Sequence, residues 1–114
     1  MPPVPKLPPR IDSEKHRRFV SEHWCVVCME GQIVWAGHTV SQCAHNRIGF
    51  FMKGKRPCDS KTVPLCPGHH QIDNAAQHNS NEAEWWTKHG IDPFEISREL
   101  AANSPDAKIR ETVK

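Results

Sequence analysis

The side chains of this chain that are best suited to metal binding and catalysis are its thiols and imidazoles. The 114 residues include five Cys and eight His. Two of the pairs that they form have the spacing of metal ligands, because two residues separate Cys25 from Cys28 and Cys66 from His69. Zinc prefers four nitrogen or sulfur ligands in a tetrahedron. The two pairs together therefore predict one structural zinc site.

Two further thiols, Cys43 and Cys58, fall outside this spacing. Either is an alternative to His69 as the fourth ligand, although we expect both to be packing or loop residues. The odd cysteine count and the Pro-rich start without an apolar signal sequence disfavour disulfides and favour a cytoplasmic setting. No run approaches the roughly 20 apolar residues that cross a membrane, so no membrane partner is expected.

Three other histidines fit the hydrolysis of phosphodiesters. His45 ends a predicted strand, His70 directly follows the second zinc pair on a predicted helix, and His78 lies eight residues later, at the end of that helix. Hydrolysis of a phosphodiester needs a base that deprotonates water and a cation that neutralises developing charge. Imidazole serves both tasks near neutral pH. The order strand, loop and helix is the one that a ββα-metal site requires, and zinc would bring these elements together.

A cluster of cations lies in the long loop predicted over residues 46–61. Lys53, Lys55 and Arg56 stand close together, Arg47 precedes them, and no acid follows Arg47 before Asp59. The net charge of +2 is too small by itself to indicate nucleic acid. The clustering does indicate it, because cations that grip phosphates supply affinity without sequence information. The alternative is an ordinary solvated loop.

The elements that must position these groups follow from capping and hydrophobic patterns. Asp12 or Ser13 caps a short helix that ends near Glu22. Asn81 and Asp92 begin two later helices, the first stopping at Gly90 and the second carrying an apolar stripe. That stripe comprises Phe94, Ile96, Leu100 and Ala101. Between these helices we expect a strand over residues 32–36 paired with a second over 39–45, a short strand over 62–65, and a helix over 67–76.

The organisation along the chain predicts one small domain. Residues 1–11 form a Pro-rich disordered lead, residues 12–102 the folded unit, and residues 103–114 a polar tail. A hydrophobic core alone is marginal at this size, and the mean hydropathy is only −0.66. The expected fold class is therefore α+β, a zinc-stapled domain with flanking helices.

Several motifs together resemble the HNH (His-Me finger) endonucleases, over roughly residues 25–100. They resemble most the small phage and prophage group related to the Ref recombination-associated nuclease. The motifs are Cys43-Ala-His-Asn-Arg47, Lys53-Gly-Lys-Arg-Pro57 with Asp59, Val63-Pro-Leu-Cys66-x-x-His69-His70, Gln77-His78, and Trp85-Trp86 through His89-Gly-Ile-Asp-Pro93. The resemblance implies a ββα-metal fold that is treble-clef-like, and a DNA endonuclease leaving 5′-phosphate and 3′-hydroxyl ends.

The resemblance also implies a role for each matching residue. His45 corresponds to the histidine that activates water, and Asp59 to a polar residue that orients the base or aids the metal. His70 and His78 correspond to ligands of a catalytic Mg²⁺ or another divalent ion. The four zinc residues match the structural zinc of zinc-containing members. A recombinase or another phage protein is an expected partner beside DNA.

Three departures from the HNH pattern concern the catalytic metal. Ala44 stands where many members carry a ligand before the base, and Lys61 where they carry the middle Asn. His78 is eight residues after His70 rather than four, so Asp73 or Asn74 is an alternative ligand. Two other functions use the same zinc: a non-catalytic DNA-binding module, and a treble-clef interaction domain whose Pro-rich start binds a partner. Neither accounts for the three histidines.

Overall fold

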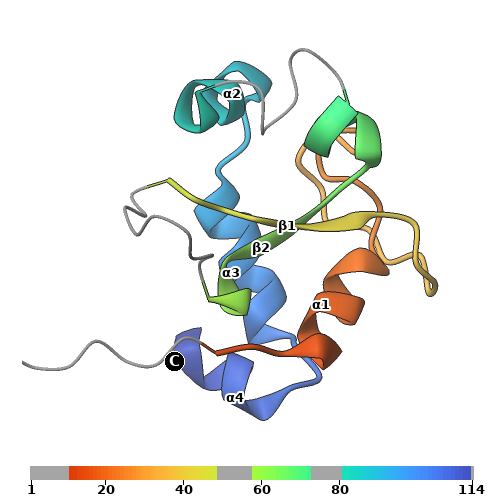
Figure 1. The fold of residues 1–114 in the computed structure, drawn as a ribbon, viewed down its shortest axis with the longest axis vertical. Helices are drawn as coiled ribbons and strands as arrows, with labels where there is room; N and C mark the ends of the chain where they lie inside the picture. Colours follow the sequence, from red (N-terminus) through yellow and green to blue (C-terminus); the bar gives the residue numbers. More distant parts are fainter. Residues whose placement is uncertain (1–10, 49–57, 73–80, 114) are drawn as a thin grey trace, which may run out of the picture.

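The computed structural model describes residues 11–48, 58–72 and 81–113. Two short antiparallel strands, β1 (Gln42–His45) and β2 (Thr62–Leu65), run through the middle of the domain (Figure 1). Their register pairs Gln42 with Leu65 and His45 with Thr62. The strand predicted over 62–65 is confirmed, and the strand predicted over 39–45 is confirmed for its last four residues.

The predicted pairing of residues 32–36 with this strand is wrong. Trp35 instead forms an isolated antiparallel bridge with His23, directly after the first helix. Backbone bonds from Trp24 N–H to the Val34 carbonyl (2.9 Å) and from Ala36 N–H to the Glu22 carbonyl (2.9 Å) extend this contact. Aromatic packing favours it, because the ring of Trp35 meets the His23 ring edge-on at 5.0 Å.

The predicted caps are confirmed at three helices. Helix α1 (Glu14–Ser21) begins after Ser13, whose hydroxyl accepts from the His16 N–H at 3.0 Å. Asn81 accepts from Glu84 N–H at the start of α2 (Glu82–His89), which ends at Gly90 with φ +69°. Asp92 caps α3 (Pro93–Ala102). Each cap satisfies a backbone donor that lacks a partner within its helix.

The core lies between the strand pair and these helices. Val20 of α1, Ala44 of β1, Val63 and Leu65 of β2, and Leu100 of α3 are at most 2% exposed. Trp85 and Trp86 of α2 are buried as well and belong to the same core. The predicted apolar stripe of α3 is wrong at Phe94, which is 44% exposed. Its other members, Ile96, Leu100 and Ala101, are buried.

The chain after β2 differs from the helix predicted over 67–76. A 3-10 turn, η1 (Asp59–Lys61), leads into β2, and a π-helical turn, η2 (Gly68–Ile72), follows it. Residues 73–76 lie outside the described residues. Gly68 is a weak helix former, and the turn closes through a bond from His70 N–H to the Cys66 carbonyl at 2.9 Å. This wider turn carries His69 and His70.

The segment after residue 103 is folded rather than a polar tail. It forms α4 (Ala107–Arg110) and the 3-10 turn η4 (Glu111–Val113), with Ile109 fully buried. The Ser104 hydroxyl bonds His16 Nδ1 at 2.8 Å, which ties this segment to α1. One buried Ile among polar residues left no periodicity by which to predict this. The Pro-rich lead lies outside the described residues up to position 10.

The fold is thus a small mixed domain of helices and a two-stranded sheet. None of the helices in the described ranges is long and apolar enough to cross a membrane.

Candidate functional site

The two predicted zinc pairs meet in space. The ligand atoms of Cys25, Cys28, Cys66 and His69 all lie within 4.8 Å of one another. His69 Nδ1 is 3.4 Å from Cys25 Sγ, and Cys28 Sγ is 3.9 Å from Cys66 Sγ. Tetrahedral zinc with its usual bond lengths separates ligand atoms by about 3.5–3.8 Å. The four residues therefore form a cluster that could hold a structural metal such as zinc.

The chain brings this cluster together through two turns. The first pair follows α1 in a turn closed by Met29 N–H to the Cys25 carbonyl (3.0 Å) and Gly31 N–H to the Val26 carbonyl (2.7 Å). Gly31 has φ +89°, a conformation that glycine adopts without strain. Val26 N–H also bonds the Pro64 carbonyl of β2 at 3.1 Å, which places the turn beside the second pair. Cys43 and Cys58 lie outside the cluster.

The electrostatics of the cluster favour a bound cation. Burial, followed by hydrogen bonding and charge from Cys25 and then Cys66, raises the pKa of the Cys28 thiol to about 12. Charge on the neighbouring sulfurs disfavours the thiolate of Cys28, and a bound positive ion would offset this repulsion. A divalent metal supplies this charge, and its binding releases protons. The donor set of three sulfurs and one nitrogen is one that zinc prefers.

The predicted base is held by a carboxylate. His45 ends β1, and its Nε2 lies 2.8 Å from Oδ1 of Asp59 in turn η1. The His45 side chain is 13% exposed and that of Asp59 is fully buried. A carboxylate that accepts from Nε2–H selects the neutral tautomer with its lone pair on Nδ1. The geometry thus suits an imidazole that takes a proton at Nδ1.

Asp59 is in turn fixed from α1. Its Oδ2 accepts from Ser13 N–H at 2.6 Å and from the Arg17 guanidinium at 2.5 Å. Burial opposes ionisation of this carboxyl, but the bonds from Ser13, His45 and Arg17 outweigh it and hold the pKa of Asp59 below its ordinary value. Asp59 is therefore a carboxylate at neutral pH. The sequence did not indicate Ser13 or Arg17 as site residues, because they lie more than forty positions before Asp59.

His70 is fixed by a residue at the other end of β1. Its Nδ1 lies 2.7 Å from the amide oxygen of Gln42, three positions before His45. When Nδ1–H donates to this oxygen, the neutral ring carries its lone pair on Nε2, the form in which imidazole binds metals. Sequence reasoning missed Gln42, although its place on the strand of His45 could have indicated it. Among the described residues, the Cys/His cluster is the one group of three or more His, Cys, Asp or Glu side chains that could hold a metal ion.

The other predicted site residues lie partly inside and partly outside the described residues. Arg47 is exposed, and its backbone N–H donates to the Glu82 carboxylate at 3.1 Å, so an acid lies beside it. Lys53, Lys55 and Arg56 of the basic loop lie outside the described residues, as does His78. Ala44, at the position of a common HNH ligand, is fully buried in the core.

No family model matches the chain. No curated protein and no solved structure matches it either.

Proposed function

We propose that this protein is a metal-dependent DNA endonuclease of the HNH kind, with β1, β2 and η2 as its ββα-metal elements. The observation that supports this most is the bond between His45 and the buried Asp59 carboxylate. An oriented imidazole at the end of a strand is what water activation in phosphodiester hydrolysis needs. The Cys/His cluster serves as the structural staple beside it.

In the proposed mechanism His45 Nδ1 takes a proton from water, which then attacks the phosphorus in line. Asp59 keeps the ring in the required tautomer and stabilises the imidazolium that forms, since its own charge is held by Arg17 and Ser13. His70 would contribute one ligand to a divalent ion, with His78 as its proposed partner. That ion, when bound, supplies positive charge to the scissile phosphate and the leaving oxygen.

The test is nicking of supercoiled plasmid by the zinc-loaded protein with Mg²⁺ or Mn²⁺. The wild type is expected to nick the plasmid, and His45→Ala to do so on the order of 10²–10⁴-fold more slowly. His38→Ala is a matched control, because His38 is exposed and lies outside the site. Cleavage by His45→Ala at the wild-type rate would refute the assigned base. A wild type that binds DNA but cleaves none would favour the non-catalytic zinc module, a function with which the buried Ala44 agrees.

A further inference from the structure

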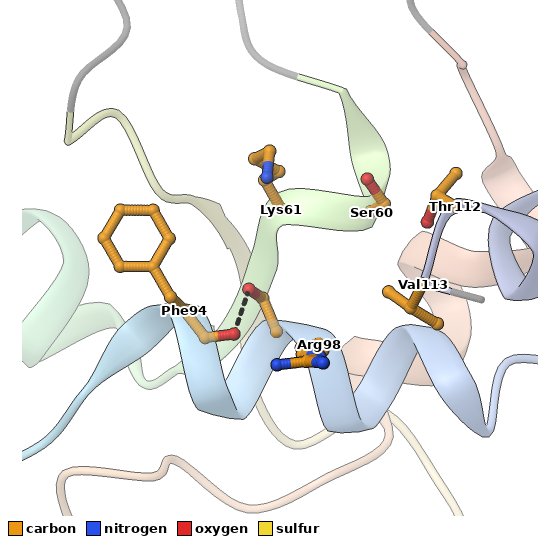
Figure 2. A pocket seen from close by; sticks show the side chains of 7 residues that line it. Ser60, Lys61, Phe94, Arg98, Thr112 and Val113 are labelled. Atoms are coloured by element: carbon orange, nitrogen blue, oxygen red, sulfur yellow. Dashed lines mark hydrogen bonds between the residues drawn. The ribbon is translucent and has the colours of Figure 1, made fainter.

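A second feature of the fold is a pocket beside turn η1. It has a volume of about 340 Å³ and lies between η1, α3 and η4 (Figure 2). This volume is at the lower end of the range of pockets that hold small organic ligands. Its seven lining residues are Ser60, Lys61, Phe94, Ser97, Arg98, Thr112 and Val113.

The chemistry of the lining is that of a site for an aromatic anion. Lys61 and Arg98 contribute two cations, three hydroxyl residues add polar groups, and none of these seven described residues is an acid. Phe94 stands at one end in Figure 2 and is 44% exposed. An exposed aromatic face beside two cations is the combination that single-stranded nucleic-acid sites use, with bases stacked and phosphates paired.

The pocket adjoins the His45–Asp59 pair through the backbone. Ser60 and Lys61 directly follow Asp59 in η1. The Lys61 carbonyl accepts from Asn46 N–H at 2.7 Å, which continues the β1–β2 ladder one step beyond the His45–Thr62 pair. Residues of the pocket are therefore fixed to the same turn and strand end as the proposed base.

We propose that this pocket binds an unpaired nucleotide of a single DNA strand, next to the bond to be cut. Phe94 stacks on the base, and Lys61 and Arg98 pair with the adjoining phosphates. A base inside a duplex cannot reach Phe94 without being unstacked, which costs free energy, so single-stranded or frayed DNA is the preferred substrate. This inference rests on the proposed nuclease function for its biological sense, but nucleotide binding by the pocket is measurable without cleavage.

The experiment measures binding of the full zinc-loaded chain, without added Mg²⁺, to a fluorescein-labelled oligothymidylate and to a duplex of equal length. Phe94→Ala is expected to weaken binding of the single strand by about 5- to 150-fold, as removal of one stacking partner does. Phe94→Leu retains apolar bulk but has no aromatic ring for a base to stack on, so it is expected to lose most of the single-strand affinity as well. Trp24→Ala is the matched control, since Trp24 is 41% exposed and lies outside the pocket.

The cations are tested through salt dependence. Replacing Lys61 and Arg98 by Gln should make the plot of log affinity against log salt shallower by about 0.7 for each phosphate of a single strand that is no longer neutralised. Arg18→Gln and Lys108→Gln remove exposed cations elsewhere and should leave the slope unchanged. Arg98→Gln alone keeps the test decisive if the double variant fails to fold.

Two outcomes would overturn the proposal. One is wild-type affinity in the Phe94 and cation variants, and the other is an equal decrease in affinity for duplex and single strand. Plasmid nicking run in parallel separates this inference from the proposed function. Weak nucleotide binding by the pocket variants with no cleavage by the wild type supports the pocket and refutes the nuclease. Unchanged nucleotide binding by the pocket variants together with plasmid cleavage by the wild type refutes the pocket and supports the nuclease.

Discussion

His45 Nε2 and Asp59 Oδ1 lie 2.8 Å apart, although fourteen positions separate the two residues in the chain. The other carboxylate oxygen of Asp59 receives the Ser13 N–H at 2.6 Å and the guanidinium of Arg17. Asp59 thus connects the first helix to the end of β1. The orientation of the proposed base therefore depends on α1 as well as on the strand that carries it.

Asp59→Asn tests this dependence. The amide removes the charge that stabilises imidazolium and allows the wrong His45 tautomer, so we expect the cleavage rate to fall on the order of 10²-fold or more. DNA affinity and zinc content should remain near wild type, which a general loss of structure would not allow. Arg17→Gln is the control, since it removes a partner of Asp59 without touching His45, and should cost less activity. An Asp59→Asn variant with full activity would remove Asp59 from the mechanism.

A second prediction concerns the metal cluster. Cys28→Ser removes one of four converging ligands, so bound zinc should fall well below one per chain and the domain should lose its cooperative thermal transition. Structural zinc in small domains contributes on the order of 10 kcal/mol of binding free energy, most of which acts as folding free energy. Cys58→Ser, outside the cluster, should retain the metal. Well-folded wild-type protein without zinc, by elemental analysis, would contradict the assignment.

The sequence predicted those parts of the fold that local chemistry determines. Caps at Ser13, Asn81 and Asp92 were predictable because a side chain and a backbone N–H within three residues decide them. The Cys/His cluster was predictable because its two pairs have the spacing of ligands on a turn. Both kinds of signal lie within a few positions of the residues they describe.

Long-range packing was not predictable in the same way. Trp35 was assigned to a hairpin from its strand-like neighbours, but a bridge to His23 and the Phe19 ring at 5.9 Å determine its place. The bond from Arg17 to Asp59 and the burial of Ile109 likewise join distant segments. Nothing in the local pattern at either end of such a contact indicates the other end.

A third prediction concerns acid stability and His16. This residue is fully buried and bonds Ser104 through Nδ1, while no described residue bonds its Nε2. Burial lowers the pKa of His16 to about 4, against the opposing charges of Asp59 and Asp106. In the unfolded chain His16 therefore binds a proton near pH 6.5, whereas in the folded chain it binds one only near pH 4. Stability from the neutral ring is complete above pH 6.5 and is lost as the pH falls from there to about 4.

The variant His16→Gln separates this effect from loss of zinc in acid. Gln does not titrate, so the difference in unfolding free energy between wild type and variant should be constant above pH 6.5 and change by up to roughly 3 kcal/mol towards pH 4. Urea denaturation at a series of pH values measures it, and proton competition for zinc affects both proteins alike. Parallel curves over the whole range would show that His16 titrates as an exposed histidine does.

The last prediction separates a metal ligand from a base. His70→Ala removes a proposed ligand, so cleavage should fall at low Mn²⁺ and recover in part as the metal concentration rises, whereas His45→Ala should not recover. Gln42→Ala removes one support of the His70 ring, because the amide oxygen of Gln42 lies 2.7 Å from its Nδ1. Loss of such a support typically weakens metal binding 10- to 100-fold, so this variant should need about that much more Mn²⁺ for half-maximal cleavage. If metal titration shifts neither curve, His70 is no ligand and its bond to Gln42 serves only to hold turn η2 against β1.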